Sequence, residues 1–145
     1  RALELFQYIN PFTHSATRAD VDVYKVEPYV VVADLYTAEG HLGRGGWTWY
    51  TGSASWMYRV GLEAILGFHK EGETLRIEPT IQRAWKEFSI HYRYGSTMYE
   101  ISVKNPDGVM HGRGEVTLDG KPCGDGVIDL VDDGATHRVE VRMRG

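Results

Sequence analysis

The sequence has little cysteine and no long apolar segment. Its 145 residues include one cysteine, Cys123, so no disulfide can form within the chain. A single thiol is consistent with a reducing compartment. The longest apolar run extends from Tyr29 to Ala33 and is far shorter than the roughly 20 residues that cross a bilayer as a helix.

Basic residues are also fewer than acidic ones. The chain has 16 Lys and Arg against 20 Asp and Glu, which gives a net charge of -4. No basic surface is therefore indicated for the phosphates of a nucleic acid or for an anionic membrane, and we expect no nucleic-acid partner. A hydrophobic fraction of 42% is enough for a core, and the length fits one domain or two small ones.

Common catalytic and cofactor motifs are missing as well. The sequence has no G-x-S-x-G, no P-loop and no dinucleotide fingerprint. Its histidines are scattered without metal-ligand spacing on one element, so we expect no metal and no cofactor. Asp132-Asp133-Gly134 resembles the start of a calcium loop but lacks the remaining ligands, and it indicates a turn.

Residues 1–70 show helical spacing. Leu3, Phe6 and Ile9 form one apolar stripe, which predicts a first helix that ends at Pro11. The following stretch, "THSATRADVD", is polar and predicts turns rather than a helix.

Two further helices are predicted before residue 70. Pro28 is typical of a first helical turn, so we expect a buried helix over 27–36, although the valines there also fit a buried strand. A third helix is expected from Ser53 to Leu66, with Gly67 as its C-terminal stop.

From Thr74 onward the period changes to two. Alternating segments such as "TLRIEP" and "HRVEVRMR" predict about six short antiparallel strands without an intervening helix. Hairpin turns are expected at Tyr94–Thr97 and at Asp119-Gly120. The expected fold is α+β, with helices in residues 1–70 and an antiparallel β-sheet or sandwich in residues 71–145.

Thr51-Gly52-Ser53 stands at the start of the third predicted helix and has two interpretations. Threonine and serine are common N-caps, and by residue type alone a cap is the more frequent use. A helix N-terminus also attracts anions, and Gly52 would let a phosphate approach the backbone. Arg44 would add a positive charge, or it is simply solvated.

Aromatic and acidic residues near this segment offer sugar contacts. Trp47, Trp49, Tyr50 and Trp56 could stack on sugar rings or pack in a core. The carboxylate of Glu27 would share a helix face with Asp34, seven residues later. Glycosidic chemistry uses such acids, but without a partner in a cleft the sequence favours solvated or capping roles for them.

Two long stretches carry a specific resemblance: "YKVEPYVVVADLY" and "GRGGWTWYTGSASWMYRVGLEAILGF". Together with "LRIEPTIQRAW", they resemble the end of the glycoside hydrolase 94 family of inverting phosphorylases. The strongest likeness is to the phosphorylase-like region of cyclic β-1,2-glucan synthases, and it fades after about Gly108. The resemblance implies the last helices of an (α/α)6 barrel in residues 1–70 and an appended β domain in 71–145.

The resemblance also implies a reaction. Family members cleave a β-glucoside with inorganic phosphate as co-substrate, and the motif assigns phosphate contacts to Thr51 and Gly52, with Arg44 beside them. Trp47, Trp49 and Glu27 become expected sugar contacts. The family's general-acid Asp belongs to an upstream motif that this sequence lacks, so we expect no catalytic residue here and no activity from the chain alone.

Partners and location follow from the same resemblance. We expect β-glucan, phosphate and the remainder of the barrel as partners, within a larger protein at the cytoplasmic face of a bacterial inner membrane. Ala33 replaces a Gln of cellobiose-type members, which favours the β-1,2-glucan branch. Helices deprived of the barrel would expose apolar faces, so we expect self-association. The alternatives are a non-catalytic carbohydrate-binding or structural β module, and an inactive remnant.

Overall fold

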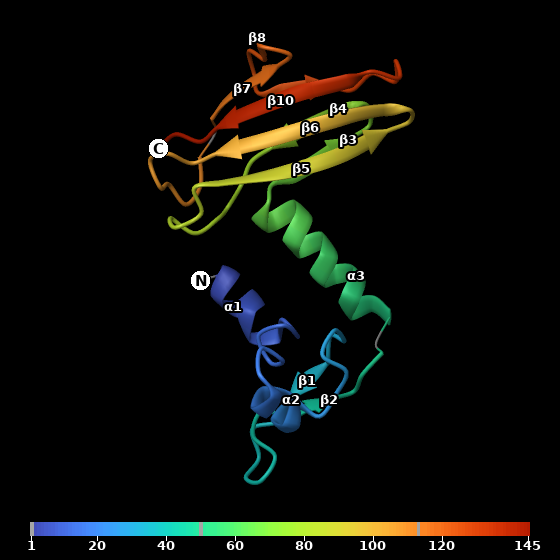
Figure 1. Ribbon diagram of the computed structural model, residues 1–145, viewed down its shortest axis with the longest axis vertical. Helices are drawn as coiled ribbons and strands as arrows, with labels where there is room; N and C mark the ends of the chain where they lie inside the picture. The colour runs from blue at the N-terminus through green and yellow to red at the C-terminus, as the bar shows by residue number, and fades with distance from the viewer. Residues whose placement is uncertain (1, 50, 113) are drawn as a thin grey trace. The chain divides into compact units, whose positions relative to one another are not determined.

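The chain forms two compact units, Arg1–Val60 and Gly61–Gly145. A computed structural model describes residues 2–49, 51–112 and 114–145 (Figure 1). Each unit has buried side chains of its own, and each is described by itself below. The division predicted after residue 70 falls inside strand β3, Phe68–Glu71.

The first helix is confirmed, and a second one was missed. Helix α1 spans Ala2–Ile9, and helix α2 spans Arg18–Tyr24 within the stretch that predicted only turns. Helix α2 forms because Thr17 and Asp20 make a capping box. The Thr17 hydroxyl accepts the Asp20 N–H at 3.2 Å, while the Asp20 carboxylate accepts the Thr17 N–H at 2.9 Å.

The predicted buried helix over 27–36 was wrong. The Val30 N–H donates to the Glu27 carbonyl at 3.0 Å in a tight turn, and the chain then continues without regular structure to strand β1, Asp34–Leu35. Val30 and Val32 are buried, whereas Ala33 is exposed. Branched valines disfavour a helix, and here this preference outweighs the helical signal of Pro28.

A small core surrounds Tyr24 in the first unit. The Tyr24 hydroxyl donates to the Val30 carbonyl at 3.1 Å, and its ring stacks on His14 at 5.3 Å between centroids. Strand β1 pairs with strand β2, Gly45–Gly46. A Cβ at Gly45 would lie 2.8 Å from Val32, so glycine is required there for close packing.

The third predicted helix is confirmed with adjusted ends. Helix α3 spans Thr51–Arg59 and continues as a π-helical turn over Val60–Ile65. The Leu66 N–H reaches the Gly61 carbonyl at 2.9 Å, five residues back, as a π turn requires. Gly67, with a φ of 72°, then ends the helical segment as predicted.

The second unit is a two-sheet β structure, and both predicted hairpins are confirmed. The five-stranded sheet has the order β5-β6-β10-β7-β8, and the three-stranded sheet has the order β3-β4-β9 (Figure 1). Beside β3, the strands are β4 Thr74–Ile77, β5 Glu87–Tyr94, β6 Thr97–Lys104, β7 Glu115–Leu118, β8 Lys121–Pro122, β9 Val127–Asp129 and β10 Thr136–Arg142.

One strand pair corrects the purely antiparallel prediction. Strand β10 runs parallel to β6 and antiparallel to β7. Parallel neighbours need a long crossover, and residues 105–135 supply it by passing through β7, β8 and β9 before β10 begins. Local sequence periodicity carries no information on that return path.

The core of the second unit lies between its two sheets. Side chains alternate along each strand, so β6 buries one face and exposes Glu100 and Lys104. The Phe68 and Tyr92 rings meet edge-to-face at 5.0 Å and join the three-stranded sheet to the five-stranded one. The most deeply buried apolar residues are Leu75, Tyr99, Ile101, Val103, Ile128, Val139, Val141 and Met143.

Candidate functional site

The N-terminus of α3 carries the predicted phosphate contacts. Thr51 is the first residue of this helix, but its side chain, like all of Tyr50, lies outside the described residues. Gly52 is exposed, and a Cβ added there would meet no described atom within 4 Å. The first N–H groups of a helix have no intrahelical partner, so the open space at Gly52 leaves room for an anion at this end.

Two tryptophans precede this helix and face solvent. Trp47 is 69% exposed and Trp49 is 65% exposed, so neither is a core residue of the described structure. Both have left-handed backbones, with φ of 52° and 62°. Non-glycine residues rarely adopt this conformation, and it is strained for bulky ones. Two exposed indole rings therefore stand on unusual backbone just ahead of α3 in the sequence.

Glu27 lies on a segment that runs beside these tryptophans. The Ala33 N–H donates to the carbonyls of Gly46 and Trp47 at 3.2 and 3.1 Å. The Tyr29 ring meets Trp49 edge-to-face at 6.4 Å. Three of the predicted sugar contacts therefore belong to adjacent segments, and Tyr29 is an aromatic neighbour that the sequence analysis did not single out.

The predicted pairing of Glu27 with Asp34 on one helix face does not occur. No helix forms over these residues, and Asp34 instead pairs with Gly46 in the β1–β2 ladder. Arg44 lies next to β2 in the loop that connects the two strands, where its carbonyl accepts the Tyr36 N–H at 2.9 Å. Its side chain is exposed.

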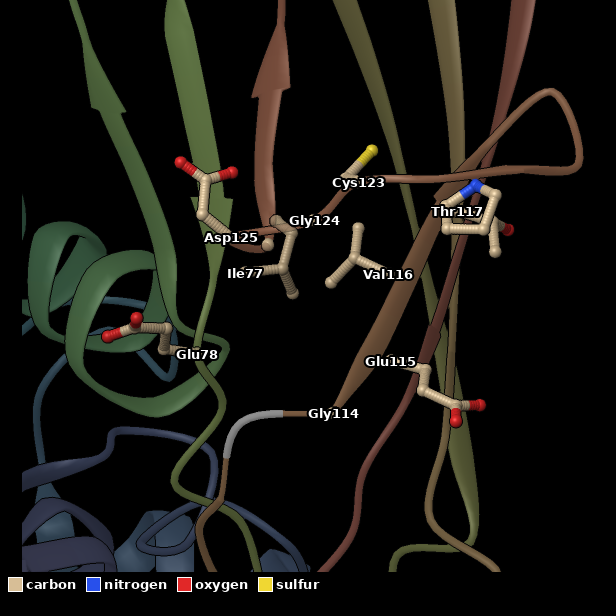
Figure 2. A pocket seen from close by; sticks show the side chains of 11 residues that line it. Ile77, Glu78, Gly114, Glu115, Val116, Thr117, Cys123, Gly124 and Asp125 are labelled. Carbon is tan, nitrogen blue, oxygen red and sulfur yellow. The ribbon is translucent and has the colours of Figure 1, made fainter.

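A separate cavity of about 640 Å³ opens in the second unit, and none of the predicted site residues lines it. In Figure 2, the side chains of Ile77 and Val116 occupy the space between β4 and β7. The complete lining is Ile77, Glu78, Gly114, Glu115, Val116, Thr117, Pro122, Cys123, Gly124, Asp125 and Gly126.

Two of the carboxylates around this cavity have local partners. The Glu115 carboxylate pairs with Arg144 at 2.8 Å, and the Asp125 carboxylate accepts the Val127 N–H at 3.1 Å. Burial raises the pKa of the Cys123 thiol, which disfavours the reactive thiolate.

The described part of the chain has neither a metal centre nor a helix that spans a membrane. Residues 2–49, 51–112 and 114–145 contain no group of three His, Cys, Asp or Glu side chains placed to hold a metal ion. Within the same ranges, each helix is too short or too polar to cross a bilayer.

Comparison with known proteins places this chain in a family. Residues 1–67 match the model of the glycosyl hydrolase 94 superfamily, catalytic domain. Over 102 residues the chain is 47% identical to the cyclic beta-(1,2)-glucan synthase NdvB of Rhizobium meliloti (strain 1021), covering 70% of this chain and 4% of that protein. It is 32% identical over 135 residues to the solabiose phosphorylase of Paenibacillus borealis, covering 92% of this chain and 16% of that enzyme.

A third relative agrees with these two. The N,N'-diacetylchitobiose phosphorylase of Vibrio furnissii is 30% identical over 122 residues, which are 83% of this chain and 15% of that enzyme. The chain belongs to the glycosyl hydrolase 94 superfamily, and its first 67 residues correspond to part of the catalytic domain. It spans between 4% and 16% of the length of these three relatives.

Proposed function

We propose that this chain is part of a β-glucan-processing enzyme of the glycoside phosphorylase type and contributes half of its phosphate and sugar site. The observation that carries the proposal is the catalytic-domain match over residues 1–67, which includes the start of α3. The relatives named as phosphorylases and as a cyclic β-(1,2)-glucan synthase support this class of reaction.

Phosphate is assigned to the N-terminus of α3. The first turn of this helix contains no acidic side chain that would repel an anion. Gly52 leaves the backbone approachable, and the helix dipole favours negative charge at this end. The Thr51 hydroxyl would add a donor, and Arg44 would add a positive charge from the β1–β2 loop.

Sugar binding is assigned to the surface ahead of α3. Trp47 and Trp49 expose flat apolar faces, which suit the apolar face of a glucosyl ring. Glu27 would accept hydrogen bonds from sugar hydroxyl groups on the neighbouring segment. In the proposed reaction, phosphate displaces the leaving sugar from the anomeric carbon. The general acid that protonates the leaving oxygen must come from elsewhere in the catalytic domain.

A Gly52→Ala substitution tests this site and is not expected to destabilise the helix. In a protein that carries this chain and the rest of a family 94 catalytic domain, we expect the Kd for inorganic phosphate to rise roughly tenfold, because the added methyl blocks close approach of the anion. Stability should be unchanged or higher by up to about 1 kcal/mol, since alanine favours a helix. Calorimetric titration with phosphate and thermal melting measure the two effects.

Gly61→Ala is the matched control for this experiment. A Cβ at Gly61 also meets no described atom within 4 Å, but the residue lies in the π-helical turn. We expect phosphate affinity to be unaltered by this change. Equal phosphate affinity in the Gly52→Ala variant and the unsubstituted protein would argue against an anion at the start of α3.

Self-association is a second expected property of the chain when it is produced alone. Large exposed apolar side chains gather in its first 60 residues, where Leu5, Tyr8, Ile9, Phe12, Val23, Tyr29, Leu42, Trp47, Trp49, Trp56 and Tyr58 are all exposed. Such surfaces favour association in water. Multi-angle light scattering should show a mass at least twice the 16.4 kDa of one chain. A monomer throughout the micromolar to millimolar range would rule this out.

We further propose that the enzyme acts at the cytoplasmic face of a bacterial inner membrane, within a larger protein. The family resemblance implies this location, and the single cysteine is consistent with a reducing compartment. Fractionation of cells that produce the longer protein tests it, and recovery of that protein in the periplasm would contradict it.

A further inference from the structure

His137 on β10 lies between two carboxylates that belong to different loops of the second unit. Its Nδ1 is 2.7 Å from Asp119 Oδ2, and its Nε2 is 3.2 Å from Asp133 Oδ2. The His137 side chain is only 16% exposed, and its ring packs against Tyr99 at 5.2 Å. A histidine is therefore held in place by negatively charged groups on both ring nitrogens.

Each carboxylate also fixes its own loop. Asp119 forms the turn between β7 and β8, where its second oxygen accepts the Arg138 N–H at 2.8 Å. Asp133 belongs to the loop 131–134, where its Oδ1 accepts the Ala135 N–H at 2.9 Å and the Thr97 hydroxyl at 3.1 Å. His137 is thus a common partner of two different loops, one on each side of strand β9 in the sequence.

The protonation state of His137 decides how many carboxylates it can bind. Only the imidazolium form has an N–H on both nitrogens. A neutral ring keeps one N–H, and its other nitrogen turns a lone pair toward a carboxylate. The shorter contact is the one to Asp119, so the remaining proton favours Nδ1. The contact between Nε2 and Asp133 is then the one that is lost.

The surroundings of the ring stabilise its charged form. The ionisable groups that face it are Asp119 from the β7–β8 turn, Asp133 from the loop 131–134 and Tyr99 from β6. The hydrogen bond to Asp119, followed by that to Asp133, holds the pKa of His137 above its usual value. Burial raises the pKa of Tyr99, which keeps this hydroxyl neutral.

The pKa values of the two carboxylates are lowered, whereas that of His137 is raised. The Arg138 N–H, followed by His137, holds the pKa of Asp119 below its usual value. The Ala135 N–H does the same for the pKa of Asp133, with smaller effects from Thr97 and His137. By strand alternation, Arg138 lies on the opposite face of β10, where it pairs with Glu100 at 3.8 Å.

We propose that His137 is a pH-sensitive latch that, when protonated, ties both the β7–β8 turn and the loop 131–134 to strand β10. Loss of its proton removes the side-chain contact between His137 and Asp133, which lies three residues before β10, and leaves the β7–β8 turn attached through Asp119. The loop retains its contacts to β6, where the Asp133 and Gly134 N–H groups both donate to the Thr97 hydroxyl at 2.8 Å, and to the β5–β6 turn, where the Ser96 N–H donates to Asp132 at 2.7 Å. It is therefore loosened rather than unfolded.

The pH window follows from the direction of the shifts. A raised histidine pKa stabilises the fold below the unfolded value of about 6.5, and this is lost as the pH rises through the higher folded value. A lowered aspartate pKa stabilises the fold above about 3.9, and this is lost as the pH falls through the lower folded value. The latch is closed between these limits and opens on the alkaline side.

Nuclear magnetic resonance on the full chain tests the latch. We expect the amide resonances and hydrogen-exchange protection factors of residues 133–135 to change with the same midpoint as the His137 imidazole, above about 6.5. Those of Asp119 and Gly120 should change less. Constant protection at 133–135 through the imidazole titration, or equal changes in both loops, would overturn the proposal.

Two variants sharpen the result. His137→Gln should abolish the change at residues 133–135 between about pH 6 and pH 9, because glutamine does not titrate in this range. His91→Gln, at an exposed position on β5, should preserve it. A retained change at 133–135 in His137→Gln would assign the effect to another group. If this variant fails to fold, the titration of the unsubstituted chain alone still decides between the outcomes.

Discussion

Thr51→Val is expected to raise the phosphate KM of the proposed phosphorolysis roughly ten- to a hundredfold in a protein with a complete family 94 catalytic domain. Valine keeps the shape of threonine but removes the hydroxyl donor. A hydrogen bond to a charged group is worth about 1.5–3 kcal/mol, and each 1.4 kcal/mol is a tenfold change in affinity. The rate of sugar 1-phosphate release, measured across phosphate concentrations, gives the result.

Thr37→Val provides the control for this substitution. Thr37 is exposed in the loop between β1 and β2. Its replacement by valine exchanges a hydroxyl for a methyl, as Thr51→Val does. Its phosphate dependence should equal that of the unsubstituted enzyme. If Thr51→Val also retained that dependence, the Thr51 hydroxyl would have no part in phosphate binding.

Gly67→Ala is expected to destabilise the second unit by roughly 2–5 kcal/mol, from backbone strain and steric overlap together. Gly67 has a φ of 72°, and a Cβ there would lie 2.1 Å from the carbonyl carbon of Glu78. The Glu78 N–H donates to the Gly67 carbonyl at 2.8 Å, so the two backbones cannot separate without losing that bond. Urea unfolding followed by near-ultraviolet circular dichroism measures the loss.

Gly72→Ala separates the two causes. Gly72 has a φ of 57°, but a Cβ there would meet no described atom within 4 Å. This variant should lose only about 1–2 kcal/mol of unfolding free energy, which is the cost of an alanine in left-handed backbone. Equal losses from the two variants would mean that the close approach of Gly67 to Glu78 has no energetic consequence.

The sequence predicted the β unit better than the first 60 residues, for a physical reason. Alternation buries one face of each strand, and turn residues such as Asp119-Gly120 mark the hairpins, so local patterns are sufficient there. The parallel pairing of β10 with β6 joins residues more than 30 positions apart. It depends on the crossover through β9 into the other sheet, which no local pattern encodes.

Helix assignments failed where a local signal was overlooked or misjudged. The capping box of Thr17 and Asp20 is visible in the sequence and would have located α2. Pro28 predicts a helix over the valines at 30–32, yet the chain there is not helical and buries Val30 and Val32 in the small core around Tyr24. The β-branched valines indicated the local structure better than Pro28 did.

The candidate site was only partly accessible from sequence. Helical spacing and Gly52 indicated the N-terminus of α3, but whether Trp47 and Trp49 pack inside or face solvent depends on two left-handed backbones that tryptophan seldom adopts. The contact of His137 with Asp119 and Asp133 depends on the order of strands and the path of a loop. Scattered histidines gave no sign of it.

Calorimetric titration of inorganic phosphate into the longer protein tests the central claim most directly. The account predicts saturable phosphate binding by the unsubstituted protein and an affinity roughly ten- to a hundredfold weaker for Thr51→Val, with Thr37→Val unchanged. Equal phosphate affinity for all three proteins would contradict a phosphate site at the N-terminus of α3.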